Sequence, residues 1–454
     1  MNGPQAIAFA LLLLALAVSA GAEDEPVAQE EPRAAAESVM TQILGTALDY
    51  RTPLVSLDVV EQALTDLSHH GFSMSWDASP APWTRGLLEN QKQLDLCREM
   101  AKRLVQHGMG TVFVFSWRRL LPVKPSADQV TWRGETLNPE TGAFETDSES
   151  PRWNFGSEGA RTAFEVRCRA LFEAVGPFHM FLSDEQIIAS PGGNSPHINK
   201  ISTYWTSPTY SKKALGDSDA PGSFRHYLAA VGYPEAATTK FPVTTVEVAP
   251  SAGANMGLPA VPLNEGNADR LQADNGWPDS TLWRHWYGWR TEVYKEWVDA
   301  LTTAAHDTWS GRSDWLGCAF AAPQYWYDPA LGLDIDKIAA VPHVDYVVAG
   351  YYSGKKFQHI KAAALKHGKK WGGMVELSHY GHQQGVAPQA IIDTFKANVE
   401  AGASIMLAYS GTNFRSDRPT PNDRGSYYMP DQVAAWGECI KWLEAGRGVK
   451  RIAN

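Results

Sequence analysis

The chain contains 454 residues, with 40 lysines and arginines against 50 aspartates and glutamates, which gives a formal net charge of −10. This acidic balance argues against a nucleic acid as the main partner, because phosphate binding requires a basic surface. Hydrophobic residues make up 44% of the chain and charged residues 20%, so the composition is that of a globular protein and excludes a largely disordered one.

The chain begins with a segment typical of an export signal. Residues 6–18 form an unbroken apolar run, which is too short for a membrane span of about 20 residues. Residues 20–22 read Ala-Gly-Ala, the small-residue pattern of a signal cleavage site. We therefore predict a signal peptide over residues 1–22, a flexible acidic leader over 23–39, and a secreted or periplasmic location. No Lys or Arg precedes the apolar run, and an uncleaved N-terminal anchor is the alternative.

From residue 40 onward, short apolar runs alternate with helical patterns. Strands are predicted at residues 43–48, 72–76, 111–115, 178–182, 316–321, 345–350, 371–375 and 404–409. Helices are predicted at residues 58–69, 87–105, 161–175, 223–231, 282–305, 357–367, 389–401 and 431–443. Eight strands apolar enough to be buried on both faces predict an α/β fold, a (β/α)₈ TIM barrel forming one domain over residues 40–454. A doubly wound open sheet is the alternative, although no G-x-G-x-x-G turn follows the first strand.

A long segment interrupts this alternation after the fourth strand. Residues of about 186–280 are rich in Gly, Pro, Ser, Thr and Ala, with one short helix predicted among them. A loop of this length within a compact domain is usually functional or has small structure of its own. We expect an insertion that walls the site at this end of the barrel and sets the length of the substrate.

The four cysteines are far apart in the sequence. Cys97, Cys168, Cys318 and Cys439 form no C-x-x-C pair and no disulfide framework. Three fall in predicted helices and one in a predicted strand, so we predict buried free thiols. A bridge between Cys97 and Cys168 on neighbouring helices is the alternative.

Active sites of barrels lie at the C-terminal ends of the strands, so the residues that follow each strand are the candidates for the site. Aromatic, acidic and a few basic side chains gather there, and the chain as a whole holds 17 Trp and 16 Tyr. The candidates for substrate binding are Trp76, Asp77, Trp117, Arg118, Asp184, Trp326, Tyr351, Tyr352, His379 and Asn413. Each Trp ring could stack on the C–H face of a sugar, with core packing as the alternative, while Asp77 and Arg118 could bind hydroxyl groups or pair with each other.

Two glutamates stand out among these strand ends. Glu185 follows the fourth strand and Glu376 follows the seventh. Hydrolysis of an acetal requires one carboxylic acid that protonates the leaving oxygen and a second carboxylate that attacks the sugar carbon or activates water. Opposed strand ends can place such a pair across the barrel, and mutual repulsion would keep one member protonated. A salt bridge or a helix cap is the alternative for either glutamate.

With these residues the chain resembles clan A of the glycoside hydrolases, retaining (β/α)₈ barrels, and most of all the barrel-type bacterial β-galactosidases and their relatives. Three stretches carry the likeness. They are residues 177–185, which end in Ser-Asp-Glu, residues 223–233 and residues 282–290, which read LWRHWYGWR.

The resemblance implies roles for individual residues. Glu185 matches the acid/base of the clan and Glu376 its nucleophile, and Tyr351 or Tyr352 matches the tyrosine that hydrogen-bonds the nucleophile. The chain departs from the clan at Asp184, where the clan usually has an Asn that contacts the sugar 2-hydroxyl. An ionised Asp accepts a hydrogen bond from a hydroxyl group but donates none.

The sequence thus predicts an exported retaining glycoside hydrolase with a carbohydrate substrate, no cofactor, no metal, no nucleic acid and no membrane contact beyond export; it predicts no oligomeric state. A non-catalytic glycan-binding barrel is one alternative, motivated by Asp184. A metal-dependent barrel hydrolase is another, using His379 and His382, but no strand end carries an H-x-H pair and no third ligand is identified.

Overall fold

The computed structural model describes the chain in part. The described residues are 40–43, 74–75, 86–115, 117–124, 130–132, 136–137, 144–145, 151–153, 155, 158–184, 224–232, 280–322, 327–328, 333–349, 357–377, 386–409 and 430–446. Residues 38–454 belong to one compact unit. The predicted signal, the predicted leader and the predicted helix at 58–69 lie outside the described residues.

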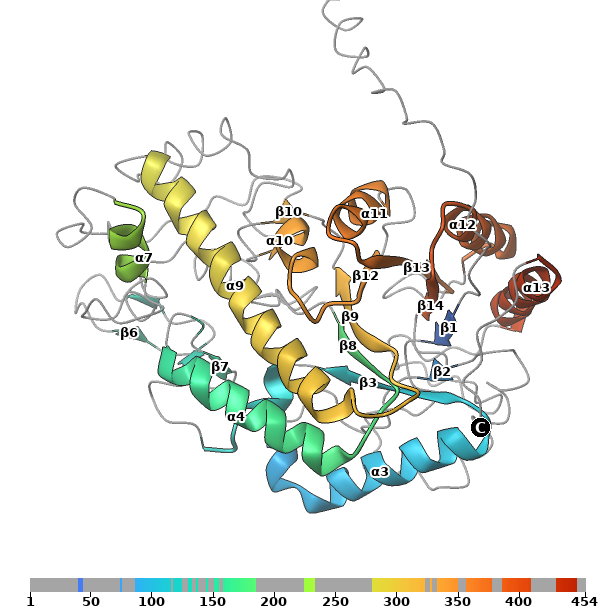
Figure 1. Ribbon diagram of the computed structural model, residues 1–454, viewed down its shortest axis with the longest axis horizontal. Helices are drawn as coiled ribbons and strands as arrows, with labels where there is room; N and C mark the ends of the chain where they lie inside the picture. Colours follow the sequence, from blue (N-terminus) through green and yellow to red (C-terminus); the bar gives the residue numbers. More distant parts are fainter. Residues whose placement is uncertain are drawn as a thin grey trace, which may run out of the picture. The chain divides into compact units, whose positions relative to one another are not determined.

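Eight parallel strands among the described residues close into a barrel (Figure 1). In chain order they are β1 (Met40–Ile43), β2 (Met74–Ser75), β3 (Gly110–Phe115), β8 (Met180–Asp184), β9 (Gly317–Ala322), β12 (Tyr346–Ala349), β13 (Lys370–Glu376) and β14 (Ile405–Tyr409). Each pairs with the next, and β14 pairs with β1. The predicted α/β barrel is confirmed, and the open sheet considered as its alternative is wrong.

Helices follow the strands much as the sequence predicts. They are the 3₁₀ helices η1 (Leu87–Glu89) and η2 (Trp117–Leu120), and the α-helices α3 (Gln91–Gln106), α4 (Glu158–Val175), α7 (Phe224–Ala230), α9 (Ser280–Trp309), α10 (Ile335–Ala339), α11 (Phe357–Lys366), α12 (Pro388–Glu400) and α13 (Pro430–Gly446). α3 ends where Gly108 takes a φ of 71°, a left-handed conformation that glycine adopts without strain. α7 lies between β8 and α9, and the rest of the predicted insertion is outside the described residues.

Alternate residues of the strands fill two separate apolar layers. The inner layer occupies the barrel interior and consists of Val112, Val114, Met180, Leu182, Ala319, Ala321, Tyr346, Val348, Met374, Ile405 and Leu407. The outer layer lies between the strands and the helices and includes Phe113, Phe115 and Phe181. This division follows from the period of two along a strand, which sends successive side chains to opposite faces.

Several aromatic side chains pack against one another in this outer layer. Phe164 of α4 and Trp297 of α9 have ring centroids 4.6 Å apart, and Phe115 of β3 lies 6.2 Å from Phe164. Figure 1 shows α4 and α9 side by side, where these rings meet. All four cysteines are free and buried, as predicted.

Two small features were not predicted. Between η2 and α4, β4 (Val130–Trp132) pairs antiparallel with β7 (Pro151–Trp153), and β5 (Thr136–Leu137) pairs antiparallel with β6 (Phe144–Glu145). We call these four short strands the strand-three arm. Before α10, β10 (Tyr327–Asp328) pairs with β11 (Leu333–Asp334), and the Asp334 carboxylate caps α10 by accepting the backbone N–H groups of Asp336 and Lys337.

The first strand differs from its prediction. β1 covers residues 40–43 and pairs with residues 405–408 of β14, whereas the apolar run of the sequence places the strand at 43–48. Pairing with a neighbour decides the register, and the run of apolar residues alone does not. None of the helices described here combines the length and the apolar composition that a membrane crossing requires.

Candidate active site at the carboxyl end of the barrel

The fourth and seventh strands bring two acidic positions to one end of the barrel. β8 is the fourth strand and ends at Asp184, directly before Glu185, while β13 is the seventh and ends at Glu376. Two strands, β9 and β12, lie between them. All eight strands of the barrel are parallel. The ends of β8 and β13 therefore both lie at the carboxyl end of the barrel, which we call the barrel mouth.

Two adjacent glycines fix the course of the seventh strand. A Cβ at Gly372 would collide with Ile405 of β14, and a Cβ at Gly373 would lie 2.5 Å from Oδ1 of Asn398 on α12. Only glycine therefore lets β13 lie this close to both neighbours. Met374 then fills the barrel interior, and Glu376 stands two positions after it, paired in register with Tyr409.

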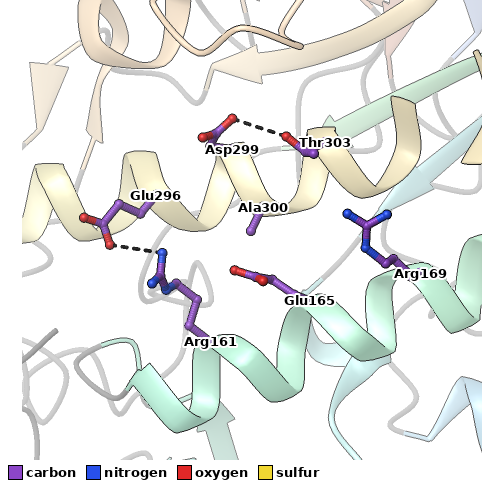
Figure 2. Close-up of a pocket in the computed structure, with 7 residues that line it drawn as sticks. All are labelled: Arg161, Glu165, Arg169, Glu296, Asp299, Ala300 and Thr303. Atoms are coloured by element: carbon purple, nitrogen blue, oxygen red, sulfur yellow. Dashed lines mark hydrogen bonds and ion pairs between the residues drawn. The ribbon is translucent and has the colours of Figure 1, made fainter. Parts of the chain in front are cut away.

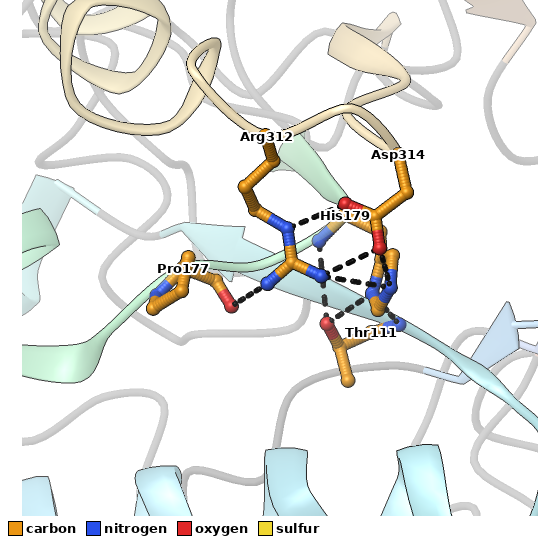
Figure 3. Close-up of polar contacts among 5 residues, drawn as sticks. All are labelled: Thr111, Pro177, His179, Arg312 and Asp314. Carbon is orange, nitrogen blue, oxygen red and sulfur yellow. Dashed lines mark hydrogen bonds and ion pairs between the residues drawn. The ribbon is translucent and has the colours of Figure 1, made fainter. Parts of the chain in front are cut away.

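The fourth strand is fixed at its opposite end by a polar network around the buried His179 (Figure 3). The backbone N–H of Thr111 donates to Nδ1 of His179 over 3.0 Å, and Nε2 lies 3.0 Å from Oδ2 of Asp314. Arg312 binds the same carboxylate at 2.7 Å and donates to the carbonyl of Pro177 over 3.1 Å. Because Nδ1 accepts a backbone N–H, we assign the ring proton of the neutral imidazole to Nε2.

The electrostatics of this network keep the imidazole neutral and the carboxylate charged. Burial, and then the positive charge of Arg312, lower the pKa of His179. The hydrogen bond from Arg312 lowers the pKa of Asp314 to about 2. The network joins β3, β8 and the α9–β9 connection at the amino end of the strands, which in such barrels serves stability and not catalysis. Sequence reasoning assigned no role to His179, since its partners are distant in sequence.

The third strand leads into η2, where Trp117 and Arg118 were predicted to bind substrate. Trp117 is 7% exposed, and its ring lies 5.0 Å from Phe164 and 5.6 Å from Phe155. Its ring therefore packs in the outer layer, which was the alternative to sugar stacking. Arg118 is described as part of the η2 backbone.

The remaining predicted site residues fall in two groups. For Asp184 and Glu376 the backbone lies at the strand ends given above, and their side chains are outside the described part of the chain. Outside it altogether are Trp76, Asp77, Glu185, Trp326, Tyr351, Tyr352, His379 and Asn413.

A charged groove between α4 and α9 is a second place with paired acids (Figure 2). Arg161 lies 3.6 Å from Glu296, Thr303 donates to Asp299 over 3.4 Å, and Glu165 faces the same groove. Burial raises the pKa of Glu296, with Arg161 acting in the opposite direction. The groove lies between two helices of the layer outside the barrel, and its ion pair links these helices. In the described portion of the chain, no group of three or more His, Cys, Asp and Glu residues could hold a metal ion.

No family model and no curated protein sequence matches the chain. In structure it is similar to the catalytic domain of a β-amylase from Paenibacillus polymyxa, with 13% identity, 90% of this chain and 99% of that chain covered, and a TM-score of 0.52. A β-galactosidase from the haloarchaeon Halorubrum lacusprofundi has 12% identity and a TM-score of 0.53, with 91% of this chain and 59% of that chain covered. The cold-adapted β-galactosidase of Rahnella sp. R3 has 12% identity and a TM-score of 0.53, with 90% and 56% covered.

At these identities the likeness shows a common fold. This chain spans nearly all of the β-amylase domain but less than two thirds of either β-galactosidase. The similar structures are glycoside hydrolases, so the resemblance drawn from the sequence to barrel glycosidases is confirmed at the level of the fold.

Proposed function

We propose that this protein is an exported retaining glycoside hydrolase that cleaves an oligosaccharide or polysaccharide. The observation that carries the proposal is the position of two glutamates: Glu376 is the last residue of the seventh strand, and Glu185 directly follows the fourth. A barrel fold shared with glycoside hydrolases supports the same reading, although a fold alone does not determine a function.

In the proposed reaction Glu185 donates a proton to the glycosidic oxygen while the carboxylate of Glu376 attacks the anomeric carbon. The C–O bond to the leaving group breaks as the ester bond to Glu376 forms. Glu185 then takes a proton from water, whose oxygen attacks the anomeric carbon and releases Glu376. Two features support this assignment for Glu376: it shares the strand alternation of Met374, which faces the barrel interior, and the two glycines before it hold the strand in place.

Other residues at the strand ends would orient the sugar. Tyr351 or Tyr352 would hydrogen-bond the nucleophile, and Asp184 would accept a hydrogen bond from a sugar hydroxyl. Trp76, Asp77, Arg118, Trp326, His379 and Asn413 would complete the binding surface. The segment between β8 and α9 would wall the mouth and limit the length of the substrate.

The test is the pair of variants Glu185→Gln and Glu376→Gln, assayed on a panel of 4-nitrophenyl glycosides and on oligosaccharides. We expect each to lose roughly 10³-fold or more in kcat. Glu185→Gln removes general acid–base catalysis, which supplies about 10² to 10⁴, and Glu376→Gln removes the nucleophile. Glu165→Gln, in the groove between α4 and α9, is the matched control and should keep normal activity. Normal turnover in either of the first two variants would contradict the proposal.

The sequence departure at Asp184 favours one other candidate function, a barrel that binds glycans without cleaving them. Binding of an oligosaccharide, measured by calorimetry, together with no hydrolysis across the panel would select that function. Loss of hydrolysis on treatment with a chelator would instead point to a metal-dependent hydrolase.

A further inference from the structure

The end of the third strand is tied to the strand-three arm by a buried hydrogen bond. The indole Nε1 of Trp153 donates to the backbone carbonyl of Trp117 over 3.0 Å. Trp153 is the last residue of β7 and is 2% exposed, so no water competes for this bond. Trp117 is the first residue of η2 and stands two positions after Phe115, the last residue of β3. This hydrogen bond therefore joins β7 of the arm to the segment that follows β3.

The two tryptophans also share their packing partners. Trp153 and Trp117 lie 5.6 Å and 5.0 Å from Phe164 of α4. They lie 5.8 Å and 6.0 Å from Trp297 of α9. Such ring contacts add to the area buried, and they hold each ring in one orientation. The hydrogen bond thus belongs to a rigid aromatic block supported by two helices.

Two further bonds hold the main chain of the same segment. The carbonyl of Leu120 accepts a hydrogen bond from Nε of Arg167, and the carbonyl of Leu121 accepts one from the backbone N–H of Gly86 at 2.8 Å. Leu120 and Leu121 are fully buried. Residues 117–121 are thus fixed from three different segments of the chain, and Arg118 stands between the fixed points.

We propose that Trp153 is a positioning residue of the substrate site. Acting through the carbonyl of Trp117, it sets the course of the main chain that carries Arg118. This main chain follows β3, whose last residue, Phe115, pairs with Ser183 of the fourth strand. This inference rests on the proposed function, because it takes the barrel mouth as the place where a sugar binds. A main chain fixed in advance lets a side chain meet its substrate without a cost for ordering the loop.

The chain offers a closely matched control at the other end of the barrel. Nε1 of Trp309 donates to the carbonyl of Phe172 over 3.1 Å, and Trp309 is also 2% exposed. Its ring lies 5.4 Å from Phe178, just before β8 begins. Trp153→Phe and Trp309→Phe each keep an aromatic ring and lose one buried N–H donor.

The experiment compares kcat, KM and Tm of the two variants with those of the unaltered protein, on the 4-nitrophenyl glycoside that the unaltered protein hydrolyses fastest. We expect both variants to lose a similar few degrees of Tm. Only Trp153→Phe should raise KM, about fivefold, which is about 1 kcal/mol of binding free energy. Its kcat should change less than twofold, because the bond does not touch the two glutamates. Hydrogen exchange of residues 117–121 should quicken in Trp153→Phe alone.

An unchanged KM in Trp153→Phe, or an equal rise in KM in Trp309→Phe, would refute the positioning role while leaving the hydrolase intact. Unchanged exchange of residues 117–121 would refute it as well, since the bond would then not hold that segment. If the unaltered protein neither cleaves nor binds any glycan, the proposed function fails, and the inference fails with it.

Discussion

At the scale of single residues, His179 gives the fold a dependence on pH that can be measured. Its pKa is lowered in the folded state, so between that pKa and the usual value of about 6.5 the unfolded chain binds more protons than the folded one. Stability is therefore expected to fall as the pH drops below about 6.5. Protonation would also place a second donor at Nδ1, opposite the N–H of Thr111. Thermal unfolding of the protein and of His179→Gln between pH 5 and 8 measures this contribution.

The informative quantity in that experiment is the slope of Tm against pH, and not the value of Tm at one pH. His179→Gln should have a lower Tm at every pH, but a flatter dependence below about pH 6.5. Equal slopes in the protein and in His179→Gln would show that the buried imidazole does not titrate as we infer.

The position of a single residue could be predicted from the sequence where that residue stands at the end of a clearly predicted strand. Glu376 ends a strand whose apolar run is unambiguous, so its strand number and its end of the barrel followed from the pattern. Trp117 could not be resolved in the same way, because a Trp beside a strand end suits both a core and a sugar platform. Its partners Phe155 and Trp297 are distant in sequence, and no local pattern indicates that they surround it.

At the scale of elements, β13 has two adjacent glycines, Gly372 and Gly373, where the structure leaves no room for a side chain. The Cβ of Gly373→Ala would lie 2.5 Å from Oδ1 of Asn398, whose amide donates to the carbonyl of Thr394 over 2.7 Å within α12. The Asn398 side chain, the strand or the helix must then move, and overpacking of a core costs about 1–3 kcal/mol. We expect Gly373→Ala to lower the Tm by several degrees and to lower kcat, because Glu376 ends the same strand. Calorimetry and the glycoside assay measure the two effects.

A second glycine supplies the control for this prediction. Gly437 lies within α13, and a Cβ there would meet no atom within 4 Å. Gly437→Ala should leave the Tm unchanged or raise it slightly, since Ala is the better helix former by about 1 kcal/mol. Adding Asn398→Ala to Gly373→Ala should restore part of the activity by making room. If Gly373→Ala is as stable and as active as the unaltered protein, the close approach is not a constraint.

Elements with a long, regular pattern were predicted well, and short ones were not. α4 and α9 cover 18 and 30 residues and lie within a few residues of their predicted ends. The strand-three arm was missed because its strands have two or three residues each, too few to show an alternation. β1 was placed too late because its register depends on β14, which lies more than 350 residues away. The periodicity of apolar residues indicates which face of a helix or strand is buried. The pairing of a strand with its neighbour determines where that strand begins and ends.

At the scale of the whole molecule, the reactivity of the four cysteines can show whether the barrel unfolds as one cooperative unit. They are spread around it, on α3, α4, β9 and α13, and all are free and buried. Burial raises the pKa of Cys439 to about 12 and also raises the pKa of Cys168 and of Cys318. A buried thiol in its neutral form does not react, because the thiolate is the nucleophile.

We therefore expect the native protein to react with no equivalent of Ellman's reagent at pH 8, and the urea-unfolded protein to react with four. As urea is raised, the four thiols should become reactive at one common midpoint, which should coincide with the loss of tryptophan fluorescence. The reason is that the inner and outer layers share six strands of the barrel, β3, β8, β9, β12, β13 and β14. Two reactive thiols after unfolding would show that one pair of cysteines is bridged, in contradiction to the four free thiols of the structure. A thiol that reacts at a lower urea concentration, identified by mass spectrometry, would mark a part of the barrel that opens independently of the others.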